Sequence, residues 1–209
     1  GNVGSATAAT GFDVANSARF DNVGDDSLTR SKGSETSLRK GTFSWWMKRA
    51  ENEGTAMIVY SNETTSDSNR AYIEVDANEN FRVISSEGSD TQILLVTDAE
   101  FRDFSAWTNF VVSVDTTQGT AANRVKIYIN GVLETSFSTS TYPGQNADLI
   151  LFKGGQTNKE HIGKINGESP KLSAYLSEFV FVDGLQLAAD QFGEFDSDSG
   201  IWKPIDVSG

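Results

Sequence analysis

Three carboxylates between residues 74 and 79 have a spacing that acid–base chemistry could use. Glu74, Asp76 and Glu79 follow the pattern Glu-x-Asp-x-x-Glu at the end of an alternating apolar segment, 71–75. Two carboxyls about 5–5.5 Å apart can serve as nucleophile and general acid/base in retaining glycoside hydrolysis. Residues 77–80, however, have the composition of a turn, which predicts that Glu79 is carried away from the other two. Glu74 and Asp76 then share one face of a strand, as solvated carboxylates commonly do, and we expect no catalysis there.

A second acidic segment has the residue types of a calcium loop. Asp196 and Asp198 alternate with serines before Gly200, and such oxygen ligands can wrap around a hard cation. The glycine comes one position too early for an EF-hand, and no acidic ligand follows at the required distance. The same residues also form common turns, so a calcium loop and a plain turn both stay open. Further loop carboxylates, without a distinctive spacing, are Asp25, Asp26 and Asp67.

Aromatic side chains beside amides are the candidate glycan contacts, because a sugar can lie on a flat ring while polar groups hold its hydroxyls. Trp45 and Trp46 are adjacent in a strand-like segment, so one must face a core and the other the opposite surface. We take Trp46 as the ligand contact, together with Tyr142, Gln145 and Asn146 in one loop. The alternative for Tyr142 is that it covers the edge of the core. Trp107 is expected to pack at a strand start, and Trp202 to anchor the C-terminal tail.

Composition excludes several function classes. The 209 residues contain no cysteine and a single histidine, His161, which excludes disulfides, zinc ribbons and thiol catalysis and disfavours a His-based metal site or triad. We expect His161 to be structural. With 17 basic and 29 acidic residues the formal net charge is −12, which argues against nucleic acid as a partner. No apolar segment approaches the ~20 residues of a membrane-spanning helix, so no membrane insertion is expected.

The hydropathy period along most of the chain is two, which predicts strands. Residues 1–17 are expected to form a flexible linker or arm, and residues 18–209 a single domain. Asn130-Gly131 is a strong type I′ hairpin signal. One short helix is expected near the C-terminus, at 187–192. Expected strands are 42–48, 55–61, 71–75, 81–85, 92–97, 110–114, 125–129, 133–137, 149–152, 161–165 and 175–182. So many short strands indicate an all-β sandwich or barrel.

Four segments, taken in order, resemble the concanavalin A-like lectin/glucanase superfamily in its laminin-G-like branch. They are FSWWMKR (43–49), WTNFVVSVD (107–115), RVKIYING (124–131) and YLSEFVF (175–181). Two further segments are similar to a version found in bacteriophage structural proteins, particularly of marine phages. They are DTTQ with AANR (115–118 and 121–124) and the tail FGEFDSDSGIWKP (192–204). The resemblance covers residues 18 to 205 and implies a jelly-roll β-sandwich of two antiparallel sheets.

The resemblance also implies a function. It places the chain on the surface of a virion, as a fibre or capsid decoration domain that attaches to host-surface polysaccharide without catalysing a reaction. Laminin-G-like domains often hold calcium at loop carboxylates, which makes Asp25, Asp26 and Asp67 further candidate ligands beside Asp196 and Asp198. Other virion proteins are expected partners, and fibre architecture suggests a homo-oligomer, such as a trimer.

Three alternatives stay open. A purely structural decoration or assembly module would have no ligand. A laminarinase-type hydrolase would use the Glu74 segment, whose spacing those superfamily members share, although their intervening residues are apolar. A laminin-G-like adhesion domain of a cell-surface protein is the third.

Overall fold

The computed structural model describes residues 12, 14–24, 26–31, 33–51, 54–63, 69–154, 160–165 and 170–207. The elements are β1 (Ala18–Phe20), β2 (Leu28–Arg30), β3 (Lys40–Arg49), β4 (Met57–Glu63), β5 (Arg70–Val75), β6 (Asn80–Glu87), β7 (Asp90–Glu100), β8 (Thr108–Asp115), α1 (Ala121–Arg124), β9 (Val125–Ile129), β10 (Val132–Leu133), β11 (Phe137–Thr141), the 3₁₀ turn η1 (Ile150–Phe152), β12 (Glu160–Ile162), β13 (Ala174–Asp183), the 3₁₀ turn η2 (Ala189–Gln191), β14 (Gly193–Phe195) and β15 (Trp202–Pro204).

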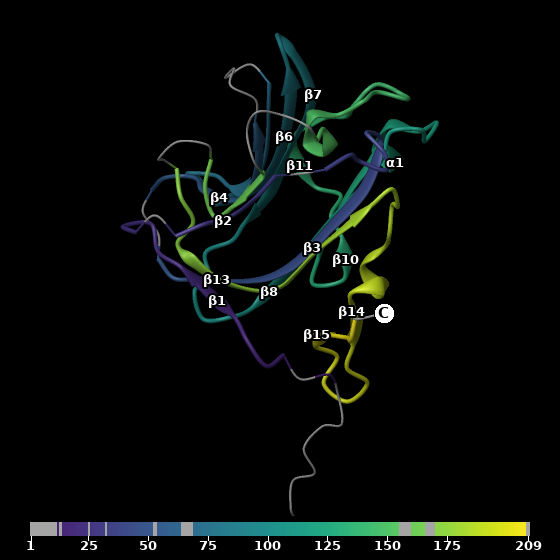
Figure 1. The fold of residues 1–209 in the computed structure, drawn as a ribbon. Helices are drawn as coiled ribbons and strands as arrows, with labels where there is room; N and C mark the ends of the chain where they lie inside the picture. Colours follow the sequence, from purple (N-terminus) through teal and green to yellow (C-terminus); the bar gives the residue numbers. More distant parts are fainter. Residues whose placement is uncertain are drawn as a thin grey trace, which may run out of the picture.

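Two antiparallel sheets pack face to face, as Figure 1 shows. Sheet A has the order β1-β13-β3-β8-β9-β10, and sheet B the order β11-β7-β6-β5-β4-β12-β2. Strands that are distant in sequence are neighbours in both sheets, which is the crossover pattern of a jelly roll. The predicted all-β jelly-roll sandwich is therefore confirmed. Within the described ranges, no helix is both long and apolar enough to cross a bilayer.

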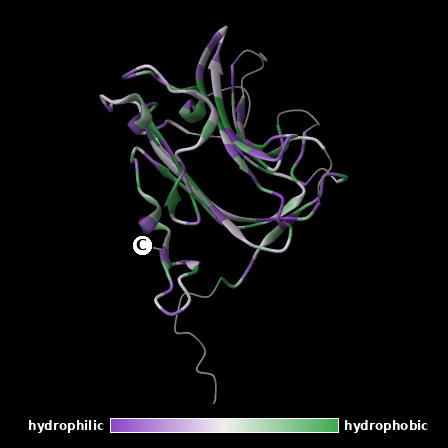
Figure 2. Cartoon of the chain, turned by 180° about the vertical axis from the view of Figure 1, so that it is seen from behind, coloured by the Kyte–Doolittle hydropathy of each residue, from purple (hydrophilic) through white to green (hydrophobic). Residues whose placement is uncertain are grey.

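The main core lies between the sheets and follows from strand alternation. Along β3, Phe43, Trp45 and Met47 face the core, and Trp45 is fully buried among aromatic rings of neighbouring strands. Figure 2 shows hydrophobic and hydrophilic residues following one another along the strands. Each inward side chain is separated from the next by one that faces away, which is the period-two pattern expected from the sequence.

The outer face of sheet A carries a second, smaller core. Residues 187–207, which we call the C-terminal strap, lie across this face and include the hairpin of β14 and β15 (Figure 1). Trp46, Val111, Ala189, Phe192 and Trp202 form its buried cluster. The Trp202 indole Nε1–H donates to Asn109 Oδ1 at 3.0 Å, and its ring lies against Gly131. The expectation that Trp202 anchors the tail is confirmed.

Two tight turns agree with the sequence. Asn130 and Gly131 both have positive φ, 48° and 79°, and join β9 to β10. A β-carbon at residue 131 would also lie 2.3 Å from the Trp202 ring. Glycine is therefore required there for two reasons, the positive φ and the contact with Trp202. Residues 77–79 form the turn between β5 and β6, as predicted.

Three expected elements differ from the structure. Residues 149–152 form the buried turn η1 instead of a strand, and the helix expected at 187–192 is only the 3₁₀ turn η2. The strand expected at 133–137 ends with β10 at Leu133, and the chain then crosses to sheet B, where β11 pairs with β7. Hydropathy alone cannot separate a short buried strand from a buried turn.

Most of the linker expected at 1–17, namely 1–11 and 13, lies outside the described residues. Residues 14–17 are described and lie against sheet A, where the Ser177 hydroxyl donates to the Asn16 carbonyl at 2.7 Å. The domain boundary itself stays a prediction.

Candidate functional site

A pocket of about 310 Å³ opens between two tryptophans on the outer face of sheet A. We call it the tryptophan pocket. Its lining residues come from the N-terminal segment, β3, the residue before β8, β13 and β15, and they are Val14, Ala15, Asn16, Ser17, Trp46, Trp107, Ser177 and Pro204. Its volume is at the lower end of the range for small-molecule sites.

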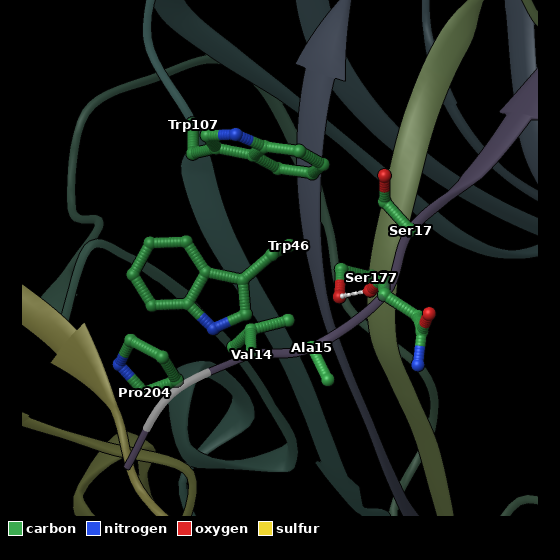
Figure 3. A pocket seen from close by; sticks show the side chains of 8 residues that line it. Val14, Ala15, Ser17, Trp46, Trp107, Ser177 and Pro204 are labelled. Carbon is green, nitrogen blue, oxygen red and sulfur yellow. Dashed lines mark hydrogen bonds between the residues drawn. The ribbon is translucent and has the colours of Figure 1, made fainter. Parts of the chain in front are cut away.

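Strand register places the two indoles. Trp46 pairs with Asn109 on β8 and with Ser177 on β13, so its side chain points away from the main core. Only 8% of Trp46 is exposed, because the rest packs into the smaller core. Trp107 directly precedes β8 and is 38% exposed. Figure 3 shows both rings bordering the same space, with Val14 and Pro204 beside Trp46.

The remaining walls come from the two ends of the described chain. The N-terminal segment 14–17 is fixed by the Ser177–Asn16 hydrogen bond, drawn as a dashed line in Figure 3. Pro204 is contributed by the C-terminal strap, which Trp202 holds on the sheet. The pocket therefore depends on residues 14–17 and the C-terminal strap docking on the same face of sheet A.

The lining residues define what the pocket can bind. Aromatic and apolar side chains provide most of the surface, and Asn16, Ser17 and Ser177 provide amide and hydroxyl groups. Among the residues that the structure describes, none that lines the pocket is charged. Apolar walls with a few polar groups are the usual composition of a ligand site, and here they fit an uncharged molecule with flat apolar faces and hydroxyl groups.

Comparison with known proteins identifies the fold family. A laminin G family model, described as the concanavalin A-like lectin/glucanases superfamily, matches residues 22–186. The chain belongs to this superfamily. No curated protein sequence matches the chain. The matched range contains Trp46, Trp107 and Ser177, whereas residues 14–17 and the C-terminal strap lie outside it, so part of the pocket wall lies beyond the match.

Two solved structures share this fold. Domains LG4-5 of the mouse laminin alpha1 chain align with a TM-score of 0.56 and 12% identity, over 85% of this chain and 44% of that chain. The CBM40 of the Ruminococcus gnavus IT-sialidase, bound to α2,3-sialyllactose, aligns with a TM-score of 0.52 and 12% identity, over 86% of this chain and 96% of that chain. This chain thus corresponds to less than half of the laminin chain, and at these identities the likeness shows the fold alone.

In this concanavalin A-like domain the predicted loop contacts do not join Trp46. Tyr142 is partly buried against the main core, as the alternative expected, and burial raises its pKa. Gln145 and Asn146 are exposed, and the Asn146 N–H donates to the Thr116 carbonyl at 2.8 Å. Thr116 follows β8, seven positions from the Asn109 that pairs with Trp46, and seven extended residues span about 23 Å. The four predicted residues therefore cannot line one monosaccharide site, and a glycan contact at the loop stays a prediction.

From the sequence, Trp107 was expected only to pack at the start of a strand. In the structure it lines the pocket. Asn16, Ser17 and Ser177 carried no signal at all, since serine and asparagine are common in linkers and strands. Only the convergence of distant segments brings them beside Trp46.

The predicted calcium residues lie in the turn between β14 and β15. Asp196 Oδ1 accepts from the backbone N–H groups of Asp198 and Ser199 and from the Ser199 hydroxyl, at 2.9 to 3.1 Å. Its Oδ2 lies 3.3 Å from Lys203 Nζ. Both oxygens thus have partners within the hairpin, while Asp198 is exposed. Asp25 and Asp67 lie outside the described residues. Within the described part, no group of three or more Asp, Glu, His or Cys side chains could hold a metal ion.

Through these contacts the Asp196 carboxylate stabilises the hairpin of β14 and β15, and this stabilisation depends on pH. Hydrogen bonds from Ser199, and then Lys203, lower the pKa of Asp196 to about 2. Because the folded pKa is below the ordinary value of about 3.9, its contribution to stability is present above that value and lost as the pH falls towards 2. We expect the Asp196 carboxyl to titrate near 2 by NMR, and Asp196→Ala to speed amide exchange at residues 198–200. Asp198→Ala is the matched control and should not change exchange; equal effects would refute the assignment.

The three carboxylates at 74–79 have different partners and do not form one site. The expectation that Glu74 is solvated is wrong: Glu74 is buried in an ion pair with Arg82, and burial raises its pKa. Asp76 accepts from the N–H groups of Asn78 and Asn80 and so stabilises the turn. Glu79 lies in that turn at φ 70° and pairs with Arg49 and Arg102. As expected from the turn, Glu79 is held apart from the Glu74 face of the sheet.

His161 lies on β12 and is buried, with its Nδ1 3.2 Å from the Thr29 hydroxyl of β2. The contact ties two neighbouring strands together, which agrees with a structural role.

Proposed function

We propose that this chain is a non-catalytic glycan-binding domain, carried on the surface of a phage particle, that attaches to host-surface polysaccharide through the tryptophan pocket. The observation that carries the proposal is the pair Trp46 and Trp107 around an uncharged pocket that also presents amide and hydroxyl groups. The virion location rests on the resemblance of residues 115–124 and 192–204 to phage structural proteins. Many copies on one particle would raise the avidity of a weak site.

The composition of the pocket favours neutral sugars. An acidic sugar needs a cationic partner to offset its desolvation, and the described residues that line the pocket include no lysine or arginine. The formal net charge of −12 also repels acidic polysaccharide in general. We therefore propose neutral hexose units of bacterial or algal polysaccharides as the ligand.

The non-catalytic part of the proposal rests on the acidic residues. Glu74 and Glu79 each form ion pairs with arginines, and the turn between β5 and β6 separates them. A retaining hydrolase needs both carboxyls on one site about 5–5.5 Å apart.

Binding of the labelled chain to an array of neutral and acidic polysaccharides, with and without EDTA, tests the proposal. We expect saturable binding to neutral polysaccharides that persists in EDTA. Trp107→Ala should weaken it at least tenfold, because it removes the exposed aromatic wall, and Trp107→Phe should retain part of it. Phe104→Ala is the matched control, since Phe104 lies in the same loop, is 37% exposed and does not line the pocket.

If the folded chain bound none of the polysaccharides on the array, the proposal would be overturned in favour of a structural decoration module. Binding that EDTA abolishes and that Trp107→Ala leaves unchanged would contradict the pocket as the site and point to a metal-dependent loop.

A further inference from the structure

A second cavity, of about 290 Å³, lies between the two sheets at the side where β2 is the last strand of sheet B. Phe43 and Phe181 of sheet A border it from one side, and Tyr60 and Glu160 of sheet B from the other. Leu28 and Arg30 of β2 are exposed at its rim, so the cavity is open to solvent there. An adjoining hollow of about 330 Å³ shares Leu28, Ile162 and Phe179 with it and extends it along the same side.

A strained backbone directs two phenylalanines into this space. The pairing of β13 with β3 shifts register between Ser177 and Val180, and Glu178 has a φ of 50°. Strand alternation from Ser177 would turn Phe179 outwards, but the additional residue of the bulge turns it inwards. Phe179 thus stacks on Trp45 with 6.0 Å between the ring centroids, and the ring centroids of Phe181 and Phe43 are 4.6 Å apart. Bulges and non-glycine residues at positive φ are concentrated at functional sites.

The cavity also contains a polar group of three residues, in which Tyr60 and Glu160 are buried and the Arg30 side chain is 59% exposed. Glu160 is 5% exposed; its Oε1 accepts from the Tyr60 hydroxyl at 2.5 Å, and its Oε2 accepts from Arg30 Nε at 2.5 Å. Burial, and then Glu160, raise the pKa of Tyr60 well above its ordinary value, so the phenol keeps its proton. The hydrogen bond to Glu160 raises the pKa of Arg30. The charges of Arg30 and Glu160 therefore cancel.

Stability alone does not account for this group. An ion pair whose arginine is more than half exposed contributes little to stability, because solvent screens the attraction. A neutral polar group at the end of an aromatic cavity has the composition of a site that orients an apolar ligand. The cancelled charges and the net charge of −12 both disfavour an anion, while the apolar walls disfavour a cation.

We propose that this inter-sheet cavity is a second binding site, for an uncharged, one- or two-ring apolar molecule whose single hydroxyl group hydrogen-bonds to the Tyr60–Glu160–Arg30 group. The rings lie against the phenylalanines of β3 and β13, and the rim at Leu28 is the entrance. The 290 Å³ cavity shares no lining residue with the tryptophan pocket, whereas the adjoining hollow shares Asn16, Ser17 and Ser177 with that pocket.

The pair 2-naphthol and naphthalene tests the proposal, because the two molecules differ only in the hydroxyl group. Binding to the full chain is measured by calorimetry and ligand-observed NMR. We expect 2-naphthol to bind saturably and at least tenfold more tightly than naphthalene. Tyr60→Phe should reduce that ratio severalfold, since it removes the phenol from the polar group and keeps the ring.

Blocking the entrance provides the second variant. Leu28→Trp places a large ring at the exposed rim and should weaken 2-naphthol binding at least tenfold. Leu133→Trp, at an exposed leucine of the edge strand β10, is the matched control and should bind like the wild type. Trp107→Ala should also bind 2-naphthol normally, which separates this site from the tryptophan pocket. No saturable binding, equal affinity for both molecules, or normal binding by Leu28→Trp would overturn the proposal.

Discussion

Trp202→Ala is expected to lower the free energy of unfolding by about 3–5 kcal/mol, the range for truncating a large buried aromatic residue. Trp202 is 8% exposed, lies in the smaller core with Trp46 and Phe192, and donates a hydrogen bond to the buried Asn109. Removing the indole leaves a cavity against Gly131 and deprives Asn109 Oδ1 of its donor. Denaturant unfolding followed by circular dichroism measures the loss.

Phe195→Ala is the matched control for this variant. Phe195 packs edge-on against Trp202 in the same hairpin but is 53% exposed, so its truncation should cost less than about 1 kcal/mol. Trp202→Ala should also impair glycan binding, because the strap that carries Pro204 loses its anchor. Equal stability of the two variants would contradict the role of Trp202.

Glu79→Ala is expected to cost about 3–5 kcal/mol, because it leaves a buried guanidinium without its counter-charge. Arg49 is 5% exposed, and its Nη2 lies 3.5 Å from Glu79 Oε1. Burial lowers the pKa of Arg49, while Glu79 acts in the opposite direction, so the carboxylate keeps the arginine charged. Alanine retains a β-carbon at the positive φ of residue 79, which leaves the backbone strain unchanged. Equilibrium denaturation measures the cost.

Arg102→Ala removes the other partner of Glu79 and serves as the control. The Arg102 side chain is 68% exposed, so we expect a cost below about 1 kcal/mol. Adding Arg49→Met to Glu79→Ala should restore part of the loss, because no unpaired charge then stays buried. If Glu79→Ala cost no more than Arg102→Ala, the pair of Arg49 and Glu79 would not be the stabilising one.

Local rules predicted the parts of the fold that depend on neighbouring residues only. The opposite orientation of Trp45 and Trp46 follows from strand geometry, although the second core that covers Trp46 was not predicted, and the Asn130-Gly131 hairpin follows from the need for positive φ. The separation of Glu79 from Glu74 likewise follows from the turn residues at 77–80. These results needed no knowledge of tertiary contacts.

The errors occur where tertiary packing decides. Residues 149–152 are all apolar, and that composition suits a strand as well as the buried turn η1 that they form. The bulge at Glu178 has no sequence signal, because glutamate is uncommon at positive φ. The chain leaves sheet A after Leu133 because the partner of β11 is β7, a contact that the local pattern does not encode.

The candidate site was predictable only at Trp46. Its other walls come from residues 14–17, Trp107, Ser177 and Pro204, which are brought together by the docking of both ends of the described chain on sheet A. The loop at 142–146 has more typical ligand-binding residues, yet it is fastened to the opposite end of β8. Residue type alone therefore favoured the loop, whereas cavity geometry favours the tryptophan pocket.

The most direct test of the central claim is an NMR titration of the indole N–H signals with a neutral oligosaccharide selected on the polysaccharide array. The chain has four tryptophans, each with a resolved role: Trp45 in the main core, Trp202 under the strap, and Trp46 and Trp107 at the pocket. We predict saturable shifts of the Trp46 and Trp107 signals with the same dissociation constant, and an unchanged Trp45 signal. Binding that shifts neither pocket tryptophan would contradict the account.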